Sequence, residues 1–491
     1  MRRHVSGRRP PPALILSSRA GLTRRYGPRG FLRIHALLRE LSDGIEGAAL
    51  VYVDDECTLG ALGATPVSPR KPEAIHGLIE RLEASLSPRL PAAVWLIGGH
   101  DVIPFFRLAN PAEDPDGDLL SDAPYAGRAG DPFNPLRPVG RLPDIHTEGA
   151  SLASLLARAL PQAVQPAPAD GASRGGYSAS LWREAAQEVF SSLAPPGELR
   201  MSPPWDARDY YQLRLAGARI KYYNLHGKPD GLVWYGQRDP LMAADYPNFP
   251  VALRQSDISA PEARGAAVVT EACYGAALEP RSIAGRFLHL GAAVYLGAMA
   301  MAYGAIAPPV SGADVLAKEF LRHLLAGHAA GEAHMLAKLA FTRTMMAEQG
   351  FLDSEDQKTV LSFVLLGNPL TRLTHSPAGH IDGGTVEELR QPESVPVVCA
   401  RSVHDPRPLH LQSSLLDELE SYASAFMVPE TPLAGSSRQG TCIQLPNCEH
   451  SRWSHGGGQV LSIRQTLSTG ALRLARFTLA QGRIAKAVVS R

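Results

Sequence analysis

Short, continuous apolar runs recur along the first three quarters of the chain, and segments with helical spacing of apolar residues separate them. In the first part, such runs lie at 13–18, 48–55 and 92–99, and residues 74–86 have helical spacing. An apolar run without alternation is typical of a strand that is buried on both faces, as in a parallel sheet. The repeated order of strand, helix and strand predicts an α/β layered fold with a mostly parallel sheet.

The alternation starts again after a stretch rich in Pro, Ala and Gly. Residues 161–176 have this composition and predict a linker, which a predicted helix at 147–160 precedes. The elements expected beyond it are helices at 180–193, 313–327 and 331–349, strands at 218–225, 265–273 and 292–298, and a last apolar segment at 364–370. The pattern therefore predicts two consecutive α/β units.

The character of the sequence changes after about residue 376. Residues 471–491 alternate apolar and polar side chains around Gln481-Gly482, and this pattern is typical of a β-hairpin. We therefore expect a small C-terminal domain that contains β-structure.

Length, charge and cysteine content narrow the class of protein. A chain of 491 residues suggests several domains. Lys and Arg number 49 and Asp and Glu number 48, a net charge of +1, so no overall field attracts the protein to nucleic acid or to an anionic membrane. The five cysteines are scattered and odd in number, which argues against a disulfide framework and favours a reducing compartment.

Neither the N-terminus nor the rest of the chain has the pattern of a membrane or export signal. Residues 1–12 form a basic tail, and the apolar run at 13–16 is too short for the core of a signal peptide. No apolar run has the length and continuity of a membrane span. These features predict a cytoplasmic protein.

Residues with reactive or polar side chains directly follow two of the predicted strands. His226 and Gly227 follow the run at 218–225, and the apolar run that begins at 265 ends in Glu271-Ala272-Cys273. The carboxyl ends of parallel strands meet at one edge of a sheet, where ligand sites form. The two stretches therefore predict a thiol and an imidazole side by side.

A thiol beside an imidazole can carry out nucleophilic catalysis. The thiolate is the nucleophile, and an imidazole can take the thiol proton and later give it to a leaving amine. Gly227 allows close approach of a substrate, and the N–H groups of Gly227 and Cys273 could form an oxyanion hole. We therefore predict a dyad of Cys273 and His226 that needs no cofactor and no catalytic metal.

The stretches "NLHG" and "EACYGA" resemble the His-Gly and Ala-Cys signatures of caspase-fold cysteine peptidases, the group of caspases, metacaspases and gingipains. The nearest resemblance is to the gingipain type. Further similar stretches are "LIGGHDVIPF", "SDAPYAG" followed by "VGRLP", the paired helices after the cysteine, and "LLGNPL", in which Asn368 replaces an Asp. The resemblance covers roughly residues 13–375.

This resemblance implies a three-layer α/β/α fold with two tandem caspase-like subdomains. The expected organisation is a tail at 1–12, a non-catalytic subdomain at 13–165, a catalytic subdomain at 166–375 and the β-containing domain at 376–491. In this family a carboxylate often orients the histidine, and Asp170 lies at about the corresponding place.

Strand alternation and the resemblance together predict a specificity for Arg or Lys. Glu271 lies two residues before the cysteine and so on the same strand face, and a carboxylate there would pair with an arriving guanidinium. Metacaspases carry Asp at this position, whereas Arg-specific gingipains take their pocket acid from a loop that here contains Ser178 and Ser180. Tyr303 could stack on the bound cation.

An acidic loop offers one candidate for a metal. Residues 108–143 are rich in Asp, Pro and Gly and predict a long loop. The loop's aspartates have calcium-like spacing, but Leu119 and Tyr125 stand where a calcium loop needs Gly and Glu. These aspartates are Asp114, Asp116, Asp118 and Asp122. A solvated turn is the simpler interpretation, and gingipains leave a structural calcium possible.

The combined prediction is an intracellular cysteine endopeptidase that cleaves proteins after Arg or Lys in a regulated stress or defence pathway. An activating protease or a regulatory protein is an expected partner. Two alternatives remain open: a catalytically silent adaptor with the same fold, and a thiol acyltransferase or deamidase with the same dyad.

Overall fold

The structure is a computed structural model. The residues that it describes are 13–86, 93–145, 152–164, 173–213, 215–243, 245–373, 395–397, 415, 419, 448–455, 458–466, 472–480 and 483–490. The basic tail and Asp170 lie outside them. None of the helices in the described part of the chain is long and apolar enough to cross a membrane.

The largest sheet in the described part of the chain has ten strands, in the order β2-β1-β3-β6-β15-β13-β12-β9-β7-β8. Its first half contains β1 (Ala13–Ser17), β2 (Ala49–Tyr52), β3 (Ala93–Ile97) and β6 (Val139–Leu142). These four strands are parallel, and their apolar side chains are largely buried. The predicted strands of the first part are thereby confirmed.

The second half of the sheet runs in the opposite direction. It contains β7 (Arg174–Ala179), β8 (Arg200–Ser202), β9 (Ile220–Asn224), β12 (Ala267–Thr270) and β13 (Val294–Ala298), all parallel to one another. The two halves meet at β15 (Phe363–Gly367), which is parallel to β6 and antiparallel to β13. The carboxyl ends of the two halves therefore lie at opposite edges of one continuous sheet.

Helices cover both faces of the sheet. In β12, Ala267 and Val269 belong to the apolar cluster that contains α9 (Ala313–Leu325), and Val268 belongs to the cluster that contains α8 (Ile283–His289). The three-layer α/β/α arrangement with a mostly parallel sheet is therefore confirmed. The other long helices are α1 (Arg19–Gly44), α3 (Pro72–Leu86), α5 (Leu152–Val164), α6 (Arg183–Phe190), α10 (Ala330–Gln349) and α11 (Ser354–Ser362).

Several shorter elements connect these layers. They are α2 (Glu56–Gly60), β4 (Phe106–Leu108), β5 (Leu119–Ser121), α4 (Ala123–Ala126), β10 (Val233–Tyr235), β11 (Val251–Arg254) and α7 (Ala260–Ala263).

The predicted bounds of the linker, 161 and 176, are both wrong. Helix α5 continues to Val164, and strand β7 begins at Arg174. Strand β7 lacks an apolar run because its glycines make room for neighbours. A Cβ on Gly175 would lie 2.4 Å from Leu215, and one on Gly176 would lie 2.6 Å from Leu199. Glycine there indicates close packing rather than a flexible connection.

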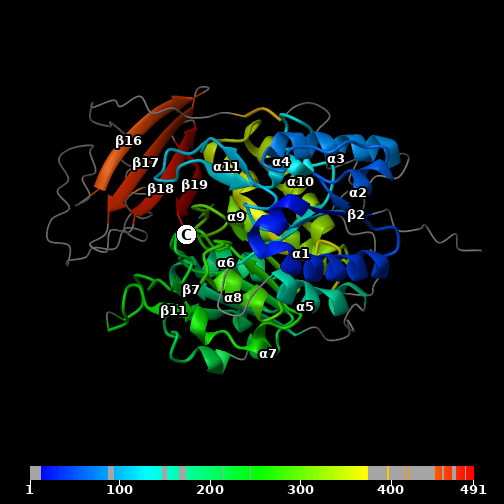
Figure 1. Cartoon of the computed structure of the whole chain (residues 1–491). Helices are drawn as coiled ribbons and strands as arrows, with labels where there is room; N and C mark the ends of the chain where they lie inside the picture. Colours follow the sequence, from blue (N-terminus) through cyan, green and yellow to red (C-terminus); the bar gives the residue numbers. More distant parts are fainter. Residues whose placement is uncertain are drawn as a thin grey trace, which may run out of the picture.

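A second, antiparallel sheet of five strands contains the C-terminal residues (Figure 1). Its order is β14-β19-β18-β17-β16, and the last four are β16 (Cys448–His455), β17 (Gly458–Thr466), β18 (Leu472–Ala480) and β19 (Arg483–Ser490). The predicted hairpin is confirmed as β18 and β19. The fifth strand, β14 (Tyr303–Gly304), comes from the α/β part of the chain. The predicted domain boundaries stay predictions.

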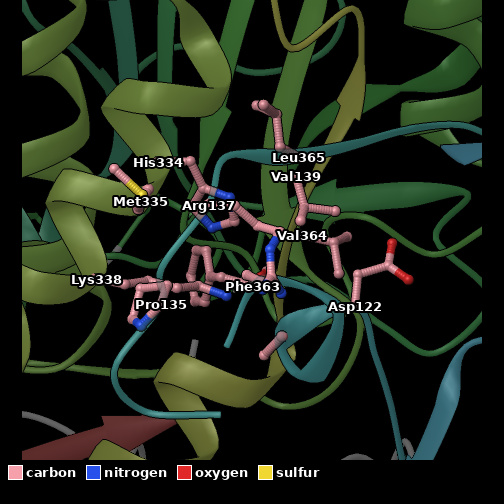
Figure 2. A pocket seen from close by; sticks show the side chains of 12 residues that line it. Asp122, Pro135, Arg137, Val139, His334, Met335, Lys338, Phe363, Val364 and Leu365 are labelled. Carbon is pink, nitrogen blue, oxygen red and sulfur yellow. Dashed lines mark hydrogen bonds between the residues drawn. The ribbon is translucent and has the colours of Figure 1, made fainter. Parts of the chain in front are cut away.

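A small cavity lined by apolar and charged side chains lies where the two halves of the large sheet meet (Figure 2). Its volume is about 20 Å³, and Asp122, His334, Lys338 and Phe363 are among its lining residues. The Lys338 ammonium donates to the Phe363 carbonyl at 3.1 Å. Burial lowers the pKa of Lys338 to about 7, and burial also lowers the pKa of His334 well below its ordinary value.

Candidate active site

The register of the large sheet places the predicted catalytic residues, His226 and Cys273, at equal distances beyond a pair of adjacent residues on neighbouring strands. Strands β9 and β12 are parallel neighbours, and Tyr223 is paired with Thr270. His226 and Cys273 each lie three residues beyond this pair. Both residues therefore follow their strands at the same carboxyl edge, as the sequence predicts.

Backbone contact brings the two stretches together. A Cβ atom added to Gly227 would lie 1.8 Å from the carbonyl oxygen of Cys273. Only glycine fits this approach without displacing one of the two segments. Among the described residues we find no acceptor for the Gly227 N–H, and this is consistent with its predicted place in an oxyanion hole.

An amide and two aromatic rings contact the imidazole of His226. Its Nε2 atom is 2.7 Å from the amide oxygen Oε1 of Gln237. The ring packs against Trp182, with centroids 4.3 Å apart, and against Phe249 at 5.7 Å. Two backbone hydrogen bonds with Tyr235 fix the main chain of His226. The ring orientation therefore depends on an amide and two aromatic side chains.

Cys273 lies in a sharp turn and is only 2% exposed. The N–H of Ala302 donates to its Sγ atom at 3.3 Å. The next residue, Tyr274, has a φ of 54°, in the left-handed region that non-glycine residues rarely adopt. Such backbone strain is found preferentially at functional sites, where surrounding contacts hold it.

Glu271 is fully buried and takes part in a hydrogen-bond network of the protein itself. The hydroxyl of Tyr222 donates to its Oε1 at 2.7 Å, and the amide of Asn224 donates to the Tyr222 hydroxyl at 3.3 Å. Glu271 directly follows Thr270, which pairs with Tyr223, and the next residue of β9, Asn224, pairs with Ser178 on β7. Glu271 and Ser178 therefore share one row of the sheet, and both are buried in this conformation.

The other predicted substrate-binding residues have partners within the protein. Ser178 donates to the carbonyl of Ala179 at 3.1 Å, and Ser180 donates to the carbonyl of Pro203. Tyr303 donates to Asp114 at 2.7 Å. Burial and the neighbouring Asp114 raise the pKa of the Tyr303 hydroxyl well above its ordinary value.

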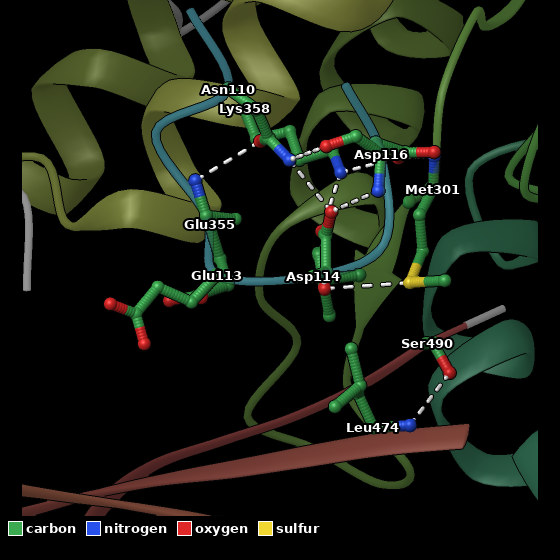
Figure 3. Close-up of polar contacts among 12 residues, drawn as sticks. Asn110, Glu113, Asp114, Asp116, Met301, Glu355, Lys358, Leu474 and Ser490 are labelled. Atoms are coloured by element: carbon green, nitrogen blue, oxygen red, sulfur yellow. Dashed lines mark hydrogen bonds and ion pairs between the residues drawn. The ribbon is translucent and has the colours of Figure 1, made fainter. Parts of the chain in front are cut away.

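The acidic loop before β5 contacts this edge of the sheet (Figure 3). The ammonium of Lys358 lies 2.5 Å from a carboxylate oxygen of Asp114 and 2.5 Å from one of Asp116. Asp116 also accepts from the N–H of Met301 at 2.8 Å and from the Tyr274 hydroxyl at 2.5 Å. The loop thus contacts Tyr274, which follows Cys273, and Met301, which precedes the Ala302 that donates to the Cys273 sulfur.

These contacts bear on the predicted calcium site. Asp114 and Asp116 share an ammonium group, and Asp122 forms an ion pair with Arg141. Calcium needs six to eight oxygen ligands, and the described residues contain no group of three acidic, His or Cys side chains arranged for a metal. As arranged, the aspartates do not fit a calcium ion, and we assign it no role.

Sequence reasoning did not find the groups that hold His226. Gln237 follows His226 by 11 residues, Trp182 and Phe249 lie further from it along the chain, and the three residues have no shared motif. Trp182 immediately precedes α6, and Gln237 follows β10. Their role arises only from packing, so no local pattern identifies them.

A thiol and an imidazole at adjacent strand ends of a three-layer α/β/α fold are typical of a cysteine hydrolase. Consistent with this class, the model of peptidase family C25, the gingipain family, matches residues 184–374. The match contains His226, Gly227 and Cys273 and confirms the resemblance to gingipain-type peptidases over these residues. It supports cysteine-type peptidase activity, for which proteins are the substrates. A search of curated proteins finds no match.

Proposed function

We propose that the protein is a cysteine endopeptidase in which Cys273 and His226 form the catalytic dyad. The observation that carries the proposal is the shared strand-end level of these residues, together with the contact of Gly227 with the Cys273 carbonyl. The thiol and the imidazole thus lie at one edge, with a glycine N–H beside them. The match to peptidase family C25 supports the same reaction class.

The proposed reaction has two steps. His226 takes the thiol proton, and the Cys273 sulfur attacks the carbonyl carbon of the scissile peptide bond. The N–H groups of Gly227 and Cys273 stabilise the oxyanion. The C–N bond breaks, His226 gives the proton to the leaving amine, and a thioester forms. Water, deprotonated by His226, then hydrolyses the thioester and regenerates the thiol.

The proposed specificity is for Arg or Lys before the cleaved bond. Glu271 is two residues from Cys273 and fully buried, and a buried carboxylate is stabilised by a bidentate guanidinium. In the present conformation the carboxylate accepts from Tyr222. The proposal therefore requires that this contact rearranges when substrate enters.

We also retain the proposal of a cytoplasmic enzyme in a regulated proteolytic pathway. Its support is the balanced charge and the scattered cysteines of the sequence. Detection of the protein in the culture medium or in an extracellular compartment would contradict it.

The main test replaces the dyad in the full-length chain. Cys273→Ala and His226→Ala should each reduce peptide hydrolysis by at least about 10³-fold, and the double variant should be no worse than either single one because the residues act as a unit. A fold unchanged by circular dichroism is the control. Substantial hydrolysis by Cys273→Ala would refute the dyad, and acyl transfer without hydrolysis would favour the acyltransferase alternative.

A peptide panel that varies only the residue before the cleaved bond tests the specificity. Wild type should cleave Arg and Lys peptides best, and Glu271→Gln should lose most of that preference. Glu262→Gln is the matched control, because Glu262 is a buried glutamate on α7 that bonds Ser259 rather than the site. Preference for Asp or small apolar residues would exclude Glu271 as the determinant.

A further inference from the structure

The C-terminal strand β19 occupies a backbone edge beside the catalytic cysteine. Strand β14 follows directly after Ala302, whose N–H donates to the Cys273 sulfur. In the antiparallel pairing of β14 with β19, Tyr303 lies opposite Ser490, and Gly304 lies opposite Val489. An extended peptide binds most readily to an open strand edge. Here β19 already occupies the edge of β14, the strand that directly follows the Ala302 contact with the thiol.

Side chains of the C-terminal sheet also surround the thiol. Cys273 shares an apolar cluster with Met301 and Tyr303 from its own unit and with Leu474 and Val488 from β18 and β19. Leu474 is fixed in place because its N–H donates to the Ser490 hydroxyl at 3.2 Å (Figure 3). The low exposure of Cys273 therefore depends partly on residues that follow it by about 200 positions in the chain.

The same sheet contacts the groups that hold the histidine. Arg473 is buried and donates to the Oε1 atom of Gln237, the atom that also contacts His226. Its guanidinium carbon lies 4.9 Å from the centroid of Phe249, which packs on the His226 ring. One strand, β18, therefore contacts the surroundings of both members of the dyad.

Buried ion pairs dock the sheet on α11. The ammonium of Lys486 lies 2.6 Å from Asp353 and 2.7 Å from Asp356. Arg476 forms an ion pair with Glu355 and donates to the carbonyl of Glu113 at 2.6 Å. Removal of one partner from such a pair leaves a buried charge uncompensated and is strongly destabilising. Substitutions at Lys486 and Arg476 should therefore weaken docking selectively.

We propose that the sheet of β16 to β19 is an intramolecular occupant of the substrate-binding edge, which limits access to Cys273, and therefore the basal activity of the full-length protein, until the sheet is displaced. This inference rests on the proposed peptidase function. In this proposal, an extended substrate peptide pairs with the edge of β14. Strand β19 occupies the same edge and so excludes the peptide. Full activity then requires that the contacts of Lys486, Arg476 and Arg473 break.

Alkylation of Cys273 by iodoacetamide measures this occlusion without reference to peptidase activity. In the full-length protein, Cys57 is exposed and serves as the internal reference. Mass spectrometry should show that Cys273 reacts at least about tenfold more slowly than Cys57 in wild type. The double variant Lys486→Glu/Arg476→Glu should raise the Cys273 rate at least about tenfold and leave the Cys57 rate unchanged.

Lys318→Glu is the matched control. Lys318 forms an ion pair with Glu188, 2.5 Å apart, which links α9 to α6 and involves no residue of the C-terminal sheet. Charge reversal there should leave the Cys273 rate as in wild type. If the double charge reversal abolishes cooperative unfolding, the milder Lys486→Gln/Arg476→Gln is the variant on which the inference is judged.

Peptide hydrolysis measured in parallel separates the two proposals. Faster alkylation together with faster hydrolysis supports both. Faster alkylation with no hydrolysis supports the occluding sheet and refutes the peptidase. If wild type hydrolyses peptides fully and the variants change neither rate, the sheet is not an occluding element, and the peptidase stands. Equal reaction rates of Cys273 and Cys57 in wild type would also overturn the inference.

Discussion

The two halves of the central sheet hold the polar groups at their strand ends by different means. In the first half, Arg141 on β6 is fully buried and donates to both carboxylate oxygens of Asp122, at 2.8 and 2.6 Å. It also donates to the carbonyls of Gly98 and Ile103. In the second half, amide, aromatic and backbone groups contact His226 and Cys273.

This difference separates a structural edge, at Arg141, from the edge at His226 and Cys273, for which we propose the reaction. A buried ion pair fixes the charge of both partners, because either neutral form would leave the other charge uncompensated. The amide, aromatic and backbone groups that contact His226 and Cys273 impose no such constraint, so a thiol and an imidazole can exchange a proton between them. The same architecture can therefore stabilise the fold at one edge and present chemistry at the other.

The largest effect is expected from Arg141→Met, which breaks the structural edge. Asp122 is then left buried without its partner, so the free energy of unfolding should fall by about 3–5 kcal/mol. Denaturant unfolding measures it. Arg208→Met is the control, because Arg208 is 84% exposed in its pair with Asp206 and should change stability by less than about 1 kcal/mol. Peptidase activity per folded molecule should persist, and its loss would contradict a purely structural edge.

Gly227→Ala should break the reactive edge instead. The new methyl group would meet the Cys273 carbonyl, and displacement of a catalytic segment by about 1 Å can reduce the rate by about 10²-fold. The measurement is kcat/KM on an Arg peptide. Gly60→Ala is the control, since a Cβ there has no atom within 4 Å. If Gly227→Ala has the same kcat/KM as wild type, the close approach of Gly227 to the Cys273 carbonyl is not needed for activity.

Lys338→Met tests the junction between the two halves (Figure 2). Burial lowers the pKa of Lys338 to about 7 in the folded protein, below the ordinary value of 10.5. Between these values the unfolded chain binds more protons, so the stability that Lys338 contributes rises as the pH rises from 7 to 10.5.

The comparison with wild type isolates this residue. Lys338→Met should be the more stable protein at pH 7, and wild type should recover by up to a few kcal/mol towards pH 10. Thermal unfolding of both proteins across this range measures the change. A constant difference between them would mean that Lys338 keeps an ordinary pKa.

The smallest effect is expected from Gln237→Leu, which removes the amide beside the imidazole. The substitution is made in the Lys486→Glu/Arg476→Glu background, because Gln237 also accepts from Arg473 of the C-terminal sheet. Trp182 and Phe249 still pack on the ring, so kcat should fall only about tenfold, with KM nearly unchanged. Gln212→Leu is the control, because Gln212 is exposed and bonds Asp209 and Tyr211 instead. A change in KM alone would assign Gln237 to substrate binding. Unchanged kinetics would show that the rings of Trp182 and Phe249 are enough to orient the imidazole of His226.

Strand prediction succeeded where side chains alternate or are uniformly apolar, and it failed where glycines pack closely. The strands that precede His226 and Cys273 and the C-terminal hairpin are confirmed at nearly their expected positions. Strand β7 was expected to be linker because "RGG" lacks apolar side chains, although Leu215 and Phe190 fill the space above its glycines. Helix α11 was also missed, since its buried side chains are mostly polar and find partners far along the chain.

The sequence by itself determined the local chemistry: two buried strands that end in His226-Gly227 and in Cys273, an α/β layered fold and a C-terminal β-hairpin. These features follow from neighbouring residues, because apolar patterning selects each element. Only the tertiary structure decided that Gln237 holds the histidine and that β19 pairs beside the cysteine. The first contact forms where the chain returns through β10, eleven residues after His226, and the second joins residues about 190 positions apart. No local apolar pattern encodes either contact, because both depend on how the elements pack.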